Sequence, residues 1–154
     1  MLMPLVLGSI VVVGNMVIQI IMMLFVIHLL LKRMPNLSTA SGFGPPARAL
    51  GGVVLVMFLG HLVQFAIWAA LFVYIGEFKE FATAFYFSAV NFTSLGYGDI
   101  VMSAKWRLLG PLEAANGVLM LGLSAGAILA VMHRVLSHFF PGFDQSPDGP
   151  DGGS

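Results

Sequence analysis

The second half of the chain contains the segment Thr93-Ser94-Leu95-Gly96-Tyr97-Gly98-Asp99-Ile100, in which two glycines flank a single tyrosine. Neither a helix nor a strand explains this segment, because glycine costs about 1 kcal/mol in a helix interior and weakens a strand. Glycine does permit positive φ, and residues that alternate between ordinary and left-handed backbone turn successive carbonyl groups toward the same side. A row of such oxygens can replace the water shell of a cation. The segment therefore predicts a carbonyl-lined loop.

The composition is that of a membrane protein. Of the 154 residues, 58% are hydrophobic and 9% are charged, and the mean hydropathy is +0.95. Soluble domains carry about 25% charged residues, so we expect one all-α domain that is integral to the lipid bilayer. The chain has no cysteine, which excludes disulfides and thiolate metal sites, and its zero net formal charge argues against binding nucleic acid.

Three apolar runs, at about residues 5–31, 50–75 and 108–136, exceed the roughly 20 residues that cross a bilayer. We interpret residues 1–34 as a retained transmembrane helix. A signal peptide would carry positive charge before its apolar run, whereas here Lys32-Arg33 follows the run.

The remaining segments have distinct compositions. Residues 35–47 are rich in proline and glycine and predict a cytoplasmic loop, and residues 139–154 predict a disordered tail. Residues 78–92 mix apolar and polar side chains and are too short to span a membrane, so we predict a re-entrant helix there. We therefore expect a module at 48–138, with an outer helix at 50–76, the re-entrant helix at 78–92, the loop at 93–99 and an inner helix at 108–138.

The basic residues predict the orientation. Lys32, Arg33, Arg48 and Arg134 would lie on one side, which the positive-inside rule makes cytoplasmic. The N-terminus is then outside, the C-terminus is in the cytoplasm, and the loop at 93–99 faces outward.

The segment Ser94-Leu95-Gly96-Tyr97-Gly98-Asp99 resembles the potassium-channel signature Thr-Val-Gly-Tyr-Gly-Asp, with Ser for Thr and Leu for Val. The whole module at 48–138 looks like the helix–pore-loop–helix unit of these channels. Its run Trp106-Arg107-Leu108-Leu109-Gly110-Pro111-Leu112-Glu113 is most similar to small bacterial ion-channel proteins related to two-pore-domain channels. The first predicted span has no counterpart in the minimal two-helix channels.

The resemblance implies a passive potassium channel in the plasma membrane, specifically a bacterial inner membrane, with residues 93–99 as the selectivity filter. One filter per chain and closed symmetry imply a homotetramer. Its partners would be K⁺ ions and lipid, and it would be no enzyme and need no cofactor beyond bound K⁺. The ions would be bound by the carbonyls of Ser94, Leu95, Gly96 and Tyr97 and by the Ser94 hydroxyl.

The other filter residues receive roles from the same resemblance. Thr93 begins the filter, and Gly96 and Gly98 permit its backbone turn. Asp99 either concentrates cations at the outer mouth or accepts a hydrogen bond behind the filter. Tyr97 would pack into an aromatic cuff, for which the candidates are Phe85, Phe87 and Trp68.

Four residues are candidates for controlling conduction. Gly117 and Gly122 are each either a hinge of the inner helix or a close-packing site. Glu113, an acid within a membrane helix, is a candidate modulatory residue that pairs with Arg107 or with a hydroxyl behind the filter. His61 is either a pH sensor or a partner in an interhelical hydrogen bond.

Two other functions remain open. The Ser94 and Leu95 departures are compatible with a weakly selective cation channel. A non-conducting accessory membrane subunit is the third hypothesis, although such a subunit would have no need of the two filter glycines.

Overall fold

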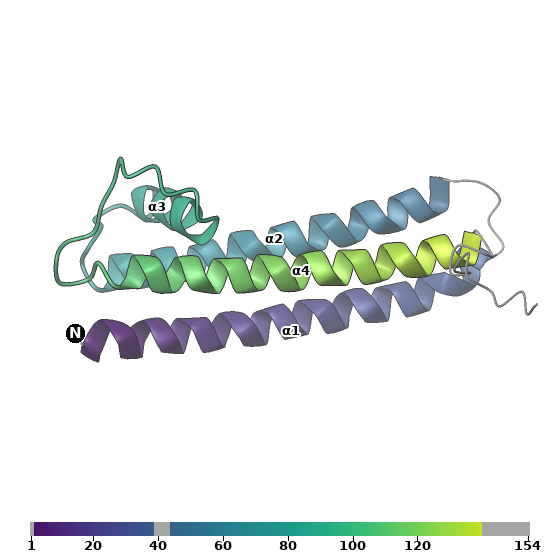
Figure 1. Ribbon diagram of the computed structural model, residues 1–154, viewed down its shortest axis with the longest axis horizontal. Helices are drawn as coiled ribbons and strands as arrows, with labels where there is room; N and C mark the ends of the chain where they lie inside the picture. Colours follow the sequence, from purple (N-terminus) through teal and green to yellow (C-terminus); the bar gives the residue numbers. More distant parts are fainter. Residues whose placement is uncertain (1, 39–43, 140–154) are drawn as a thin grey trace, which may run out of the picture.

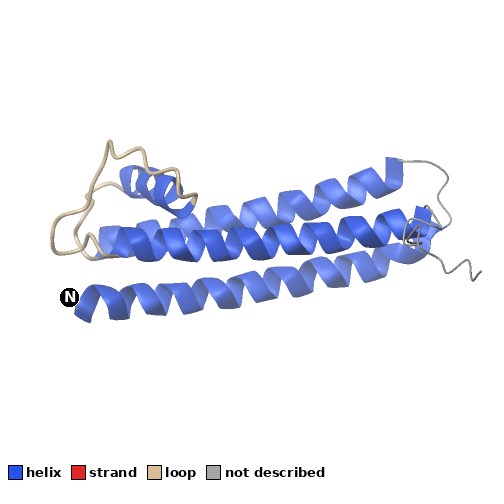
Figure 2. Cartoon of the chain, in the orientation of Figure 1, coloured by secondary structure: helices blue, strands red, loops and turns tan. Residues whose placement is uncertain are grey.

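The computed structural model describes residues 2–38 and 44–139. These residues form four helices and no strand, which are α1 (Leu2–Ser38), α2 (Gly44–Tyr74), α3 (Phe81–Phe92) and α4 (Leu109–Phe139). The three long helices run side by side, and α3 lies with its connecting loops at one end of them (Figures 1 and 2). The predicted all-α fold, with a short helix between the second and third long ones, is thereby confirmed.

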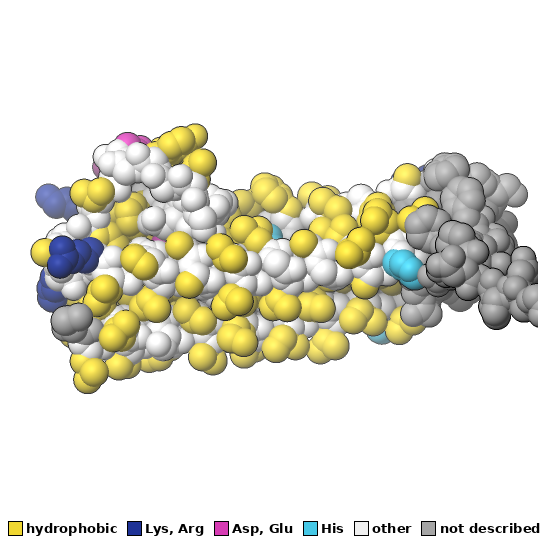
Figure 3. All heavy atoms as spheres, in the orientation of Figure 1, with side chains coloured by type: hydrophobic (Ala, Val, Ile, Leu, Met, Phe, Trp, Pro, Cys, Tyr) yellow, Lys and Arg dark blue, Asp and Glu magenta, His cyan; other side chains and the backbone are white. Residues whose placement is uncertain are grey.

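Three segments of these helices are long and apolar enough to cross a membrane, namely Leu2–Lys32, Ala47–Tyr74 and Leu109–His133. Apolar side chains cover the visible sides of the long helices, and charged side chains gather at the end that carries α3 (Figure 3). A surface of this kind is stable in hydrocarbon and would aggregate in water. The chain is an integral membrane protein.

The helix bounds differ from the predicted ones. α2 ends at Tyr74, two residues before the predicted end at 76, and α3 begins at Phe81, three residues after the predicted start at 78. At the opposite end of the bundle the helices are longer than predicted. α1 continues past Lys32 to Ser38, and α2 already begins at Gly44, so the connection is shorter than the predicted loop at 35–47. Pro45 and Pro46 fall in the first turn of α2, where a missing N–H costs no intrahelical hydrogen bond. Hydropathy marks the part of a helix within the membrane and not the end of the helix. Part of that loop, and the predicted tail beyond residue 139, lie outside the described residues.

An aromatic core fixes α3 against α2. Trp68 and Phe72 of α2 and Phe92 of α3 are fully buried. The Phe65 and Phe92 ring centroids are 4.9 Å apart and those of Phe72 and Phe87 are 5.4 Å apart, both in edge-to-face geometry. Such pairs add roughly 0.5–1.5 kcal/mol each to the burial of their surface.

α1 occupies the opposite side of the bundle. It packs against α2 and α4, and within the described residues its backbone does not come close to that of α3, which Figure 1 shows on the other side of α4. α1 and α3 therefore pack on opposite sides of the pair formed by α2 and α4.

Gly117 marks the closest approach between α3 and α4. A Cβ atom added at Gly117 would overlap the backbone carbonyl group of Phe92, the last residue of α3. A Cβ atom added at Gly122 would have no neighbour within 4 Å. Of the two predicted hinge residues, Gly117 is thus a close-packing position in this conformation, whereas Gly122 is unconstrained in the protomer.

We expect Gly117→Ala to destabilise the protein and Gly122→Ala to leave its stability nearly unchanged. The new methyl group at Gly117 meets backbone, which cannot move aside as a flexible side chain would, and overpacking of this kind costs roughly 1–3 kcal/mol. Thermal unfolding in detergent measures both variants against the parent protein. Equal melting temperatures for the two alanine variants would contradict the close approach.

Candidate functional site

The C-terminus of α3 lies within the membrane-spanning part of the bundle. The Phe92 ring contacts Phe65 and His61 of α2, with centroids 4.9 and 6.0 Å apart. The Phe92 backbone also meets α4 at Gly117, the ninth residue of that helix. At 1.5 Å per residue, this contact lies roughly 12 Å along α4 from its first residue. The residues that follow α3, which we call the glycine loop (residues 93–99), therefore start inside the bundle and return to its end.

Left-handed residues alternate along the glycine loop. Ser94 has φ of 59°, Gly96 of 59° and Gly98 of 72°. The positive φ of both glycines is as the sequence predicts. The sequence does not predict it for Ser94, which is the only non-glycine residue with positive φ in the described chain. A left-handed residue other than glycine costs roughly 1–2 kcal/mol, so the surrounding contacts must hold Ser94 in place.

Those contacts are hydrogen bonds from the inner half of the glycine loop to the end of α3. The Ser94 N–H donates to the Asn91 carbonyl at 2.8 Å, and the Leu95 and Gly96 N–H groups donate to the Val90 carbonyl at 3.0 and 3.3 Å. These bonds satisfy carbonyl groups that a helix C-terminus otherwise leaves unpaired. The Thr93 hydroxyl adds a bond to the Ala89 carbonyl at 2.7 Å.

The same hydrogen bonds determine which way the loop carbonyls point. In a planar trans peptide, the N–H of one residue points opposite to the carbonyl of the residue before it, and no cis peptide occurs among the described residues. Because three successive N–H groups point at α3, the carbonyls of Thr93, Ser94 and Leu95 point away from it. The inner half of the glycine loop thus presents a row of carbonyl oxygens on one side.

The outer end of the glycine loop is tied to α3 through one side chain. The Tyr86 hydroxyl donates a hydrogen bond to Asp99 Oδ2 at 2.8 Å. Of the two roles expected for Asp99, the hydrogen bond behind the loop is the one observed. Beyond the loop, the Glu77 carboxylate after α2 accepts hydrogen bonds from the Ser103 N–H and from the Ser103 hydroxyl, the latter at 2.9 Å.

All seven residues of the glycine loop are exposed in the single protomer. Tyr97 is 67% exposed, and within the described chain it makes none of the ring contacts expected for an aromatic cuff. The cuff candidates are occupied by other rings: Phe85 packs against Phe65, whereas Phe87 and Trp68 both pack against Phe72.

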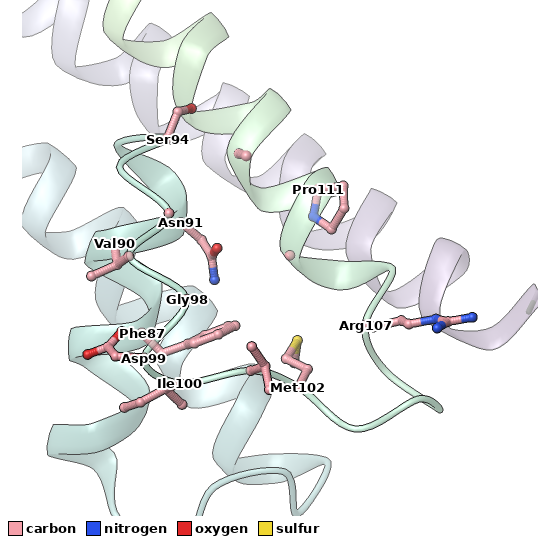
Figure 4. Close-up of a pocket in the computed structure, with 14 residues that line it drawn as sticks. Phe87, Val90, Asn91, Ser94, Gly98, Asp99, Ile100, Met102, Arg107 and Pro111 are labelled. Atoms are coloured by element: carbon pink, nitrogen blue, oxygen red, sulfur yellow. The ribbon is translucent and has the colours of Figure 1, made fainter.

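A cavity of about 580 Å³ separates the glycine loop and α3 from the start of α4. Figure 4 shows Asn91 of α3 pointing into the gap toward α4, with Gly98 and Asp99 on one side and Pro111 on the other. The Asn91 Nδ2 atom is buried and has no hydrogen-bond partner within residues 2–38 and 44–139. Arg107 lies at the rim of the cavity, and Figure 4 shows its side chain extended away from the loop.

Glu113 of α4 supports α3 from behind. It is fully buried, and its Oε1 accepts a hydrogen bond from the Ser88 hydroxyl of α3 at 2.5 Å. The partner is therefore a hydroxyl group behind the loop, one of the two partners expected from the sequence, and not Arg107. Its Oε2 has no partner in the protomer. Whether Glu113 modulates function stays a prediction.

Sequence reasoning missed Tyr86 and Ser88 as site residues. Both lie on α3, one on its exposed side and one on its buried side, and each holds an acid that the sequence did identify, Asp99 or Glu113. The available signal was their spacing. Two residues that are two positions apart project to different sides of a helix, so Tyr86 and Ser88 could be expected to contact different elements.

The Tyr86–Asp99 hydrogen bond predicts an alkaline transition at the outer end of the loop. Hydrogen bonding to Asp99 raises the pKa of Tyr86 above its ordinary value of 10.0. The stabilising effect of this hydrogen bond is therefore complete below pH 10.0. It is lost as the pH rises through the raised pKa of Tyr86, because the phenolate and the Asp99 carboxylate then repel each other. Ultraviolet titration of the tyrosines should show a late-ionising group that Tyr86→Phe removes and Asp99→Asn shifts to lower pH. A tyrosine titration unaffected by Asp99→Asn would contradict the hydrogen bond.

Comparison with known proteins agrees with this geometry. A family model described as ion channel matches residues 51–134, which is more than half of the 154-residue chain and includes the glycine loop and all of α3. No curated protein and no solved structure matches the chain. The chain belongs to the ion channel family.

Proposed function

We propose that the protein is a potassium-selective channel whose selectivity filter is the glycine loop. The observation that carries the proposal is the direction of the loop's peptides: three successive N–H groups bond to α3, so that three successive carbonyls point the other way. Oxygens fixed in a row can take the place of water around a dehydrated cation.

The stacked ion sites would be formed by the carbonyls of Ser94, Leu95, Gly96 and Tyr97, with the Ser94 hydroxyl at the innermost position. Alternating positive φ at residues 94, 96 and 98 supports the continuation of the carbonyl row along the loop. The C-terminal end of α3 adds a favourable field, because a helix carries about half a negative charge there. That end lies deep in the bundle, where a cation without its water shell needs compensation.

Four copies of the chain would complete the filter. The glycine loop is exposed in the protomer although it starts inside the membrane-spanning bundle, and irregular backbone at membrane depth is tolerated only where protein or water covers it. A chain with one such loop buries it by placing copies around a common axis, and cyclic symmetry closes that arrangement. The exposed ring of Tyr97 would then have its cuff in a neighbouring copy.

The proposed orientation places the loop outside the cell. α1 ends and α2 begins at the end of the bundle opposite the glycine loop (Figure 1), so Lys32 and Arg48 lie far from the loop. The positive-inside rule then makes that opposite end cytoplasmic and puts the N-terminus of α1 outside. The membrane would be the plasma membrane.

A weakly selective cation channel is the second candidate, since Ser94 and Leu95 replace the Thr and Val of the potassium-channel signature. Serine lacks the methyl group that restricts threonine at χ1, so the innermost site would be less rigid. Both substitutions leave the backbone carbonyls in place.

Reversal potentials in planar bilayers test the proposal. With potassium on one side and sodium on the other, the purified protein should reverse near the potassium equilibrium potential. Gly96→Ala should abolish selective current, because alanine at φ of 59° is strained. Gly14→Ala is the matched control, since a Cβ atom on that α1 glycine meets nothing within 4 Å.

Three results would count against different parts of the proposal. A current that reverses near zero would identify a weakly selective channel. The absence of any current from well-folded protein would favour the accessory-subunit hypothesis. A selective current that survives Gly96→Ala would place the filter elsewhere in the chain.

A further inference from the structure

Buried polar side chains from all three long helices meet in the middle of the bundle. They are Gln19 of α1, His61 and Gln64 of α2, and Ser124 of α4, and none is more than 5% exposed. We call this group the polar ring. Each member lies inside a segment apolar enough to cross the membrane, where a polar group without a partner is costly.

The hydrogen bonds of the polar ring form a closed circuit. Gln19 Nε2 donates to Ser124 Oγ at 2.8 Å, and Gln64 Nε2 donates to Gln19 Oε1 at 3.1 Å. His61 completes the circuit, with Nδ1 3.2 Å from Gln64 Oε1 and Nε2 3.0 Å from Ser124 Oγ. Each of the three helices is therefore bonded to the other two.

The donors and acceptors fix the direction of the circuit. The amide oxygen of Gln64 only accepts, so the proton of a neutral His61 is on Nδ1. His61 Nε2 is then an acceptor and takes the hydroxyl proton of Ser124, whose oxygen accepts from Gln19. Within the ring, each member donates one hydrogen bond and accepts one, so the ring is satisfied without charge. Three of its four bonds join different helices and therefore depend on the present positions of those helices.

The polar ring holds α4 at a second point along its length. The first point is Gly117, which lies against the Phe92 backbone. Ser124, seven residues further along α4, is bonded to α1 and α2 through the ring. Gly122 lies between the two points, and a Cβ atom added there would have no neighbour within 4 Å. A bend of α4 at Gly122 would move Ser124 and break the ring.

We propose that the polar ring is a latch through which α1 sets the position of the inner helix, with Gln19 as the positioning residue. This inference rests on the proposed function, in which α4 is the inner helix that borders the conduction path. It gives the first helix a role in gating. The ring stabilises the observed position of α4, and conformations with α4 displaced beyond Gly122 lack that stabilisation.

The packing beside the ring leaves α1 little freedom to compensate. Gly60 of α2 adjoins His61, and a Cβ atom at Gly60 would overlap the end of the Met22 side chain of α1. Gln64 Nε2 also lies 3.5 Å from the backbone carbonyl of Asn15, one turn before Gln19. α1 and α2 are therefore in direct contact on both sides of the ring.

Asn15 provides a matched control for Gln19. It lies four residues earlier on α1, on the same side of the helix, and is equally buried. Its side-chain nitrogen and oxygen have no hydrogen-bond partner among the described residues. Asn15→Leu therefore removes a buried amide of the same kind without breaking a bond of the ring, whereas Gln19→Met breaks two such bonds with little change in shape.

The first test is single-channel recording of both variants. Interhelical hydrogen bonds in membranes contribute about 0.6 to 2 kcal/mol, so Gln19→Met should change the ratio of open to closed time by about three- to thirty-fold. Ser124→Ala should have a similar effect, and the double variant should differ little from either single variant, because the circuit is already broken. Asn15→Leu should gate as the parent protein does.

The second test reads the position of α4 without any current. The chain has no cysteine, so spin labels can be placed at Leu31→Cys on α1 and Met132→Cys on α4, both exposed, in protein diluted with unlabelled chains. Pulsed electron–electron distance measurement should give a broader or displaced distribution in Gln19→Met and the parental distribution in Asn15→Leu.

A parental distance distribution in Gln19→Met would overturn the latch even if the protein conducts no current. So would current from Gln19→Met that gates within two-fold of the parent while only its melting temperature falls, because the ring would then merely hold the helices together. Absence of current from the parent protein would instead contradict the proposed function, and the distance measurement would still decide the latch.

Discussion

Backbone groups inside a membrane need partners, and this constraint accounts for the arrangement of the glycine loop. The last carbonyls of α3 and the first N–H groups of the loop satisfy one another. Because each peptide is planar, the same bonds turn the loop carbonyls to the opposite side, where protein atoms of the same chain do not cover them. The inner half of the loop thus satisfies three of its N–H donors within the chain. In the proposed channel, its carbonyl acceptors would bind an ion.

The rest of the bundle holds α3 where these bonds can form. Phe92 and Trp68 are fully buried in the aromatic core, and Gly117 lets α4 reach the α3 backbone. Ser88 and Glu113 join the same two helices by a buried hydrogen bond. α1 packs on this core as well, with Gly8 against Leu109 and Leu112 of α4, and it also bonds to the far portion of α4 through Ser124. α4 is therefore held by α3 and α1 near its start, and by the polar ring further along.

Much of the fold could be predicted because membrane length and glycine conformation are local properties. The three spans follow from hydropathy, and the positive φ of Gly96 and Gly98 follows from their lack of a side chain. Ser94 could not be predicted in the same way, since serine has no preference for left-handed backbone. Its conformation results from hydrogen bonds to α3 that exist only after the chain has turned.

The side-chain contacts between helices were harder to predict, because they depend on the rotation of each helix about its axis. The sequence shows that His61 and Gln64 share a side of α2, and that Asn15 and Gln19 share a side of α1. It does not show that Gln19 and Ser124, which are 105 residues apart, are hydrogen-bonded. Ser124 has the appearance of a small packing residue in an apolar helix. The bond from Tyr86 to Asp99 is unpredictable for the same reason, since it crosses a loop whose course is not set by periodicity.

In the proposed channel, carbonyls of the glycine loop bind potassium around a shared axis. Crystals of the full chain grown with thallium or rubidium, which are potassium analogues with strong anomalous scattering, test it most directly. We expect a line of anomalous peaks on a four-fold axis, level with the carbonyls of residues 94–97. Peaks away from that axis, or none at the loop in an ordered assembly, would contradict it.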